Sequence, residues 1–353
     1  MLLNETGKFI GGAELQQRIL MDALVGKGWK VSVVTEKVNQ TKKIELENNL
    51  TMLPVLDFSN RNKYLRKLIL LPLNLWKTLK EIDADVYYHR NPDYFSGLIA
   101  LYSKIHGKKF VLAGANNWNF DKGNEGNLNN LPEKISARYA IRHADKIIVQ
   151  NTLQKELLKA NYKREGVVFH NIFNARKLRN RFLHILWAAR IVPYKRPRWF
   201  LEFAQTMPEQ QFVMVGGKST DIGLEEETKK KAVVSKNVKY LGHRSFEEVE
   251  KLFDETSIFV NTSIPDCEGF PNTFLQAWSR GVPVISFFDP DGLIAENNLG
   301  IVVKSISQMK EAVEFLLKEQ ETGPAYSHRI QEFFLREFSI ESKIKDFIRI
   351  LQK

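Results

Sequence analysis

Residues 266–285 read DCEGFPNTFLQAWSRGVPVI and carry the strongest local signal in the sequence. Pro271 suits the start of a helix, because its ring fixes φ near the helical value and its missing N–H is not needed there. We therefore predict a helix from about Asn272 and a buried strand in the apolar run after it. Glu268 before this helix and Gln276 within it can face one ligand at the helix N-terminus. A carboxylate and an amide at this spacing suit a polyol, because vicinal hydroxyls form paired hydrogen bonds.

On both sides of these residues, the chain alternates short β-branched runs with amphipathic segments, which is typical of βαβ units and parallel sheets. In the first half we expect strands at Lys30–Thr35, Asp85–Tyr88, Lys109–Leu112, Lys146–Val149 and Val167–Phe169, and helices at Ala13–Gly26, Lys63–Lys80, Tyr94–His106, Leu131–His143 and Leu153–Ala160. In the second half we expect strands at Ile185–Ala189, Gln211–Val215, Val238–Leu241, Ile258–Asn261, Pro283–Ser286 and Ile301–Val303, with helices between them.

This repetition predicts an α/β protein with two Rossmann-like, doubly wound domains, which suits a length of 353 residues. We expect an N-terminal domain over residues 1–170, a polar linker over 171–184 and a second domain over 185–335. The remainder, 336–353, is expected to be a C-terminal helix that packs back on the first domain. Open α/β sheets bind ligands at the carboxyl ends of their strands, so a cleft between the domains is the expected site.

The charge is unevenly distributed. The chain has 52 Lys and Arg against 41 Asp and Glu, and residues 1–168 alone have 26 against 17. A basic first half suits a phosphorylated ligand or an anionic membrane surface. The cations are scattered and match no nucleic-acid-binding motif, so we expect no nucleic-acid partner. A solubilising surface remains the alternative.

The single cysteine, Cys267, cannot form an internal disulfide, and no apolar run approaches the length of a membrane-spanning helix. We therefore expect a cytoplasmic protein that is at most peripheral on the inner face of the membrane. The segment Tyr64–Lys80 interleaves Leu and Trp with Lys and Arg, as helices at a membrane interface do. Packing against a protein core explains the same pattern equally well.

Three further groups of residues suit a phosphate. Gly12 opens the first long helix, where unpaired N–H groups attract an anion. Arg190 and Lys195 follow a predicted strand and can offset the charge of a diphosphate. Gly216 and Gly217 end the next strand. The alternatives are plain glycine turns and a pair of solvated cations.

These motifs together resemble the retaining GT-B glycosyltransferases of family 4, whose signature is Glu-x7-Glu, with a Gly-Phe stretch, a helix and a Gly-x-Pro-Val strand after the first glutamate. The resemblance covers nearly the whole chain, because the motifs at Gly12, Arg190, Lys195, Gly216 and Glu268 occur in the family's order. It implies transfer of a sugar from a nucleotide diphosphate sugar to a glycan or lipid-linked hydroxyl, without a metal or other cofactor. It also suggests a role in bacterial surface polysaccharide or lipid-linked oligosaccharide synthesis.

The resemblance also implies roles for residues. Gly12 would approach the diphosphate, Arg190 and Lys195 would stabilise the leaving group, Glu268 would contact the donor sugar, and Gln276 would contact the ribose. The remaining donor contacts would come from Gly216, Gly217, Phe270, Pro271, Asn272 and Thr273.

The sequence departs from the family at three places. Gln276 replaces the second glutamate, the first strand is reduced to Met1–Leu3, and a histidine that often follows the strand Lys109–Leu112 is missing. Asn116 or Asn117 would make that contact instead.

Two further cleft candidates, His89 and Arg90, end a first-domain strand and could meet the acceptor or donor, although an isolated His is often structural. Because of the departures, a catalytically silent partner subunit that binds a nucleotide sugar and a sugar-nucleotide 2-epimerase remain alternative functions.

Overall fold

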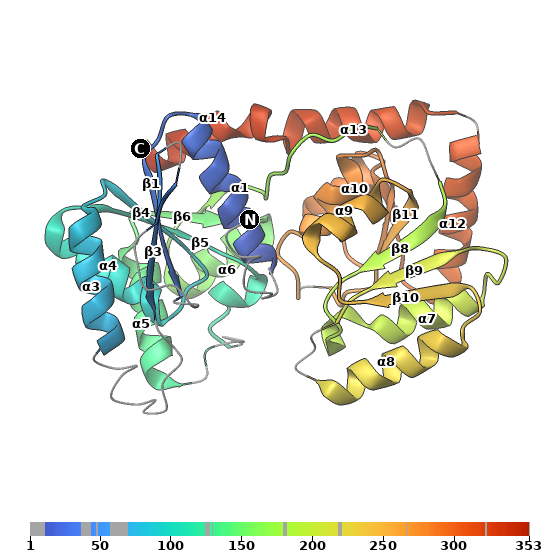
Figure 1. Cartoon of the computed structure of the whole chain (residues 1–353), viewed down its shortest axis with the longest axis horizontal. Coiled ribbons are helices and arrows are strands. Elements are labelled where there is room, and N and C mark those ends of the chain that lie inside the picture. Colours follow the sequence, from blue (N-terminus) through green and yellow to red (C-terminus); the bar gives the residue numbers. More distant parts are fainter. Residues whose placement is uncertain are drawn as a thin grey trace. The chain divides into compact units, whose positions relative to one another are not determined.

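The computed structural model describes residues 11–36, 44–46, 49–56, 70–123, 128, 130–178, 182–217, 221–265, 267–321 and 323–352. The predicted first strand at Met1–Leu3 and the start of the helix predicted at Lys63–Lys80 lie outside these residues. The chain divides into two compact units (Figure 1). Unit 1 contains Met1–His170 and Ile344–Lys353, and unit 2 contains Asn171–Lys343.

Unit 1 has the alternating pattern that the sequence predicts. Its elements are α1 (Gly12–Gly26), β1 (Val31–Glu36), β2 (Ile44–Leu46), β3 (Leu50–Leu56), α3 (Leu71–Ile82), β4 (Val86–Arg90), α4 (Tyr94–His106), β5 (Lys109–Ala113), η2 (Asn117–Phe120), α5 (Leu131–His143), β6 (Lys146–Val149), α6 (Thr152–Tyr162) and β7 (Val167–Val168). Strands β4, β5, β6 and β7 form a parallel sheet in that order. Strand β3 pairs parallel with β1 and antiparallel with β2.

Local signals set the bounds of α4. The Asp93 carboxylate accepts a hydrogen bond from the Ser96 N–H at 2.8 Å, and the Ser96 hydroxyl accepts one from the Asp93 N–H at 2.9 Å. This reciprocal cap satisfies N–H groups that have no partner within the helix. The helix ends at Gly107, whose φ of 63° is left-handed and suits glycine.

Unit 2 is built on one parallel sheet. Its elements are β8 (His184–Ala188), η3 (Pro193–Lys195), α7 (Pro197–Gln205), β9 (Phe212–Val215), α8 (Ile222–Val234), β10 (Val238–Gly242), α9 (Phe246–Phe253), β11 (Thr256–Asn261), α10 (Asn272–Trp278), β12 (Val284–Ser286), η4 (Pro290–Gly292), α11 (Leu293–Glu296), β13 (Gly300–Val302), α12 (Ile306–Glu321) and α13 (Ala325–Glu337). The strand order is β10-β9-β8-β11-β12-β13. The strand order therefore reverses between β8 and β11, where doubly wound sheets bind ligands.

The final helix, α14 (Ile340–Gln352), runs from unit 2 into unit 1. In unit 1, the buried Phe347 ring lies 5.8 Å from that of Tyr88 and 5.3 Å from that of Phe169. Residues 336–343 belong to unit 2, although the sequence assigned them to the returning helix.

Part of the predicted linker also belongs to unit 2. Residues 171–178 lie within this unit, where Phe173 forms a parallel bridge with Ser339. The Phe173 N–H donates to the Phe338 carbonyl at 2.9 Å, and the Ile340 N–H donates to the Phe173 carbonyl at 3.2 Å.

The apolar stripe of α3 packs mainly inside unit 1. Leu71, Leu75 and Leu79 are buried, whereas Leu73 is 60% exposed. Core packing therefore explains most of the described part of the stripe, as the alternative interpretation held. In the part of the chain that the structure describes, no helix has the length and apolar character needed to cross a membrane.

We predict that Phe347→Ala lowers the free energy of unfolding by about 3–5 kcal/mol, because it leaves a cavity beneath the end of α14. Urea unfolding followed by circular dichroism measures this loss. The matched control is Phe315→Ala on α12, since this side chain is 54% exposed and its removal should cost less than about 0.5 kcal/mol. Equal losses in the two variants would contradict the prediction.

Candidate functional site

The strongest candidate site lies where the order of the unit 2 strands reverses. Arg190 and Lys195 follow β8, and Ser263 and Glu268 follow β11, which pairs directly with β8. Lys195 forms an ion pair with Glu268, and the Ser263 hydroxyl donates to Glu268 Oε1 at 2.9 Å. The structure thus brings together two of the three residues that the sequence predicts to be catalytic. Arg190 is exposed nearby, and its Nη2 donates to the Tyr194 hydroxyl at 3.0 Å.

Buried hydrogen bonds hold the two loops of this site together. The Trp187 indole N–H donates to Thr262 Oγ1 at 2.9 Å, and this hydroxyl donates to the Lys195 carbonyl at 2.6 Å. Trp187 lies in β8, whereas Thr262 follows β11. The backbone that carries Lys195 is therefore fixed to the loop that leads to Glu268.

The charge state of Lys195 is sensitive to its surroundings. Burial lowers the pKa of its ammonium group, and the Arg190 guanidinium lowers it further, to about 7. The Glu268 carboxylate, which Lys195 contacts, favours the protonated form. A diphosphate would favour it more strongly, because it brings two negative phosphates to the same cation.

Arg196 is a positioning residue that the sequence reasoning missed. Its backbone is left-handed, with φ of 46°. Its guanidinium donates from Nε to the Thr262 carbonyl at 2.6 Å and from Nη2 to the Ser263 carbonyl at 2.8 Å. The guanidinium also lies 4.1 Å from the centre of the Trp199 ring. In the sequence it is one more basic residue beside Lys195, and no spacing rule marks it.

Close packing requires glycine at 216 and leaves little space for a side chain at 217. A Cβ atom on Gly216 would lie 2.2 Å from the Ala189 carbonyl oxygen, which follows β8, and one on Gly217 would lie 3.1 Å from His243 Cβ. The Tyr240 hydroxyl donates to the Gly216 carbonyl at 2.9 Å. These contacts account for Gly216 without a ligand, and its donor-binding role stays a prediction.

The loop before α10 is anchored by Asn171, another residue that the sequence reasoning missed. Its amide Nδ2 donates to the Phe270 carbonyl at 2.7 Å and to Asn272 Oδ1 at 2.9 Å. Phe270 and Pro271 are buried, and Thr273 is partly exposed at the helix N-terminus. Asn171 follows the first domain in sequence, so proximity along the chain gives no sign of this contact.

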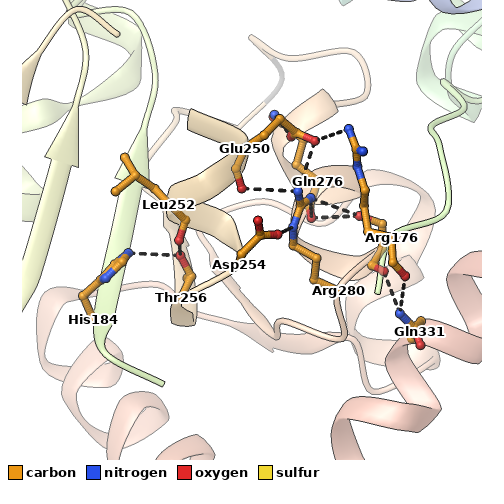
Figure 2. A network of polar contacts seen from close by, with 10 residues as sticks. Arg176, His184, Glu250, Leu252, Asp254, Thr256, Gln276, Arg280 and Gln331 are labelled. Carbon is orange, nitrogen blue, oxygen red and sulfur yellow. Dashed lines mark hydrogen bonds and ion pairs between the residues drawn. The ribbon is translucent and has the colours of Figure 1, made fainter. Parts of the chain in front are cut away.

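Gln276 belongs to a buried polar network around Glu250 (Figure 2). Its side chain is 4% exposed, and its Nε2 donates to Glu250 Oε1 on α9 at 2.8 Å. Glu250 Oε2 accepts from Arg176 at 2.6 Å and from Arg280 at 3.1 Å. The ribose contact predicted for Gln276 is not tested by this arrangement, but the amide already has a protein partner.

The same network links four segments of unit 2. Arg280 Nε also donates to Asp254 at 2.6 Å, and Gln331 on α13 donates to the Arg176 carbonyl at 2.9 Å. The side chain of Arg280 is 2% exposed, so its charge depends on these acceptors. The network therefore fixes α10, which carries the donor-site candidates at its N-terminus, against α9 and α13.

The other candidates lie in unit 1, and the structure gives structural roles to two of them. His89 pairs with Asp93, the N-cap of α4, at 3.1 Å. Burial lowers the pKa of His89, but the Asp93 carboxylate outweighs this effect and raises it overall. The buried Asn117 accepts hydrogen bonds from Asn151 at 3.1 Å and from Gln154 at 3.2 Å.

Gly12, Arg90 and Asn116 also lie in unit 1. Gly12 begins α1, Arg90 ends β4 and is buried, and Asn116 is partly exposed before η2. Their predicted ligand contacts stay predictions. Among the described residues, no three His, Cys, Asp or Glu side chains are grouped so that they could hold a metal ion.

Solved structures share this architecture. Sucrose-phosphate synthase from Thermosynechococcus elongatus is 15% identical, with a TM-score of 0.77 over 97% of this chain and 93% of that one. A glycosyltransferase from Rickettsia africae is 14% identical, with a TM-score of 0.68 over 97% and 94%. The catalytic domain of Starch Synthase IV from Arabidopsis thaliana, solved with ADP and acarbose, is 12% identical, with a TM-score of 0.69 over 98% and 96%. The two doubly wound units thus define the GT-B fold.

The family follows from the sequence matches. Residues 10–177 match the family model Glycosyltransferase Family 4, and residues 183–319 match Glycosyl transferases group 1. The chain therefore belongs to the group 1, family 4 type of glycosyltransferases, which confirms the resemblance drawn from its motifs. No curated protein matches the chain in sequence.

We predict that Gln276→Glu, which restores the family residue, lowers the free energy of unfolding by about 1–3 kcal/mol at pH 8, because it places a buried carboxylate against Glu250. This repulsion raises the folded-state pKa of the new carboxyl, so the loss grows as the pH rises through that pKa and shrinks towards pH 5. Urea unfolding at both pH values measures it. Gln205→Glu, at an exposed position in α7, is the control and should show neither effect.

Proposed function

We propose that this chain transfers a sugar from a nucleotide diphosphate sugar to a hydroxyl group, with retention at the anomeric carbon and without a metal ion. The observation that supports this proposal best is the contact between Lys195 and Glu268 at the reversal of the sheet order. In this proposal the cation binds the diphosphate and the carboxylate beside it binds the sugar hydroxyls, so the two groups flank the bond to be broken.

In this proposal the bond between the anomeric carbon and the phosphate oxygen breaks, and the acceptor oxygen bonds to that carbon from the same side. The hydroxyl proton passes to an oxygen of the departing phosphate. Lys195 and Arg190 stabilise the negative charge that develops on the nucleotide diphosphate, an effect worth several kcal/mol in a site that excludes water. Glu268 orients the sugar, and Ser263 orients Glu268.

We further propose that the acceptor is a glycan or a lipid-linked glycan, and that the reaction serves assembly of a bacterial surface polysaccharide or lipid-linked oligosaccharide. This part of the proposal is supported by the family and by the excess of Lys and Arg in residues 1–168, which suits an acceptor with phosphate groups. The donor site would lie in unit 2 and the acceptor site in unit 1.

A thermal-shift screen against nucleoside diphosphates and nucleotide sugars tests the donor site, because a ligand that binds only the folded state raises the melting temperature. We expect one nucleotide family to raise it in the native protein, and to do so much less in Arg190→Ala and Lys195→Ala. No shift with any nucleotide would contradict the proposed donor site, whereas a shift without any sugar transfer would favour the silent-partner alternative.

The pKa of Lys195 gives a second prediction for the nucleotide sugar identified in this way. Since a diphosphate binds the protonated amine, its affinity should fall by up to tenfold for each pH unit above about 7. Lys195→Arg should bind with little dependence on pH, because a guanidinium stays charged throughout this range. Isothermal titration calorimetry from pH 6 to 8.5 measures the affinity of both proteins for the nucleotide sugar. The same pH dependence in the two proteins would contradict the prediction.

We predict that Glu268→Gln lowers turnover by about 10²–10³-fold while the melting temperature of the protein stays near that of the native chain. Glu332→Ala, which removes an exposed carboxylate of α13, is the control and should keep full turnover. Sugar transfer to an acceptor is measured together with release of the free nucleotide. Full activity of Glu268→Gln would exclude the proposed role of Glu268, and a reaction that needs no acceptor would indicate an epimerase.

A further inference from the structure

An open, basic hollow of about 770 Å³ lies in unit 1 at the amino ends of β5 and β6, the edge of the sheet opposite to that used for ligands in doubly wound folds. Lys109 is the first residue of β5, and Lys146 is the first residue of β6. The lining is completed by the C-terminal parts of α4 and α5 and by the end of α14: Ala100, Ser103, Lys104, Gly107, Lys108, His143, Asp145 and Gln352.

The lining of the hollow contains four lysines and one carboxylate. That carboxylate, Asp145, accepts a hydrogen bond from the Phe110 N–H at 2.7 Å. One of its two oxygens is therefore already bonded to the backbone. Lys108 pairs with Asp83 at 2.8 Å. The remaining cations, Lys104, Lys109 and Lys146, give the hollow a positive potential that favours an anion.

The cations in and around the hollow repel one another. Burial lowers the pKa of Lys109, and Lys146 lowers it further, with Asp145 opposing. Burial also lowers the pKa of His143, and the nearby cations Lys104, Arg164 and Arg142 lower it further. An anion placed among these groups would relieve the repulsion.

We propose that this hollow binds a phosphate group, held by Lys109 and Lys146. The site is distinct from the donor site in unit 2 and does not depend on the function proposed above. The phosphate can belong to a lipid headgroup or to a soluble molecule. Leu101 and Ile105, which are 38% and 60% exposed, flank Lys104 on the outer face of α4 and favour the lipid, because apolar side chains beside lysines insert at a membrane interface.

The test compares Lys109→Ala/Lys146→Ala with Lys229→Ala/Lys230→Ala, a control that removes the same charge from exposed positions of α8. Lys104→Ala, at an exposed helix position, is a third variant in case the double substitution at the strand ends disturbs folding. All are made in the Arg190→Ala/Lys195→Ala background, so that phosphate cannot report on the donor site and failure of the proposed transfer reaction cannot affect the result.

Two probes distinguish the sources of phosphate: vesicles of phosphatidylcholine with and without phosphatidylglycerol, and inorganic pyrophosphate in solution. We expect binding to the anionic vesicles to weaken at least tenfold in Lys109→Ala/Lys146→Ala and about fivefold in Lys104→Ala, but little in the control. Pyrophosphate binding that is lost in the same variants, without vesicle binding, would support the site with a soluble ligand. Binding of neither probe, or equal losses in the Lys229→Ala/Lys230→Ala control, would overturn the proposal.

Discussion

Lys195 and Glu268 carry opposite charges on loops that leave two neighbouring strands of unit 2, and the local structure is arranged around keeping them in contact. A doubly wound sheet opens where its strand order reverses, because the connections on the two sides run in opposite directions. Here the opening is lined by backbone that Thr262 and Arg196 tie together. The ion pair therefore sits on rigid supports, and a ligand has to compete with it but does not have to assemble the site.

Away from that opening, unit 2 buries charged side chains in the network around Glu250, where each charge has an oppositely charged or polar partner. Arg280 is almost fully buried, and its guanidinium is acceptable there only because Glu250, Asp254 and backbone carbonyls surround it. Gln276 fits this network as a neutral donor. A glutamate at the same position would face Glu250, so a neutral amide suits this network better than a carboxylate. The Glu250 carboxylate accepts the hydrogen bond that the Gln276 amide donates.

Local signals made much of the fold predictable. Helix α4 has the predicted bounds because Asp93 and Gly107 mark its ends within the sequence itself. Strand β3 was missed because Pro54 lies within it, and proline removes a hydrogen-bond donor that most strands need. For the candidate site, the sequence proposed Lys195 from its position after a strand and Glu268 from its position before a helix, and the two side chains are in contact in the structure. The sequence could not show that Gln276 meets Glu250, or that Asn171 holds Phe270 and Asn272, since those partners are distant in the chain and are selected only by packing.

The parallel bridge between Phe173 and Ser339 lies near both ends of unit 2, which is one continuous stretch of chain, whereas unit 1 needs residues from both ends of the sequence. During synthesis on the ribosome, all of unit 2 is available once Lys343 has emerged, whereas unit 1 lacks Phe347 in its core until α14 follows. The half of the protein that is made first is thus the half that finishes folding last.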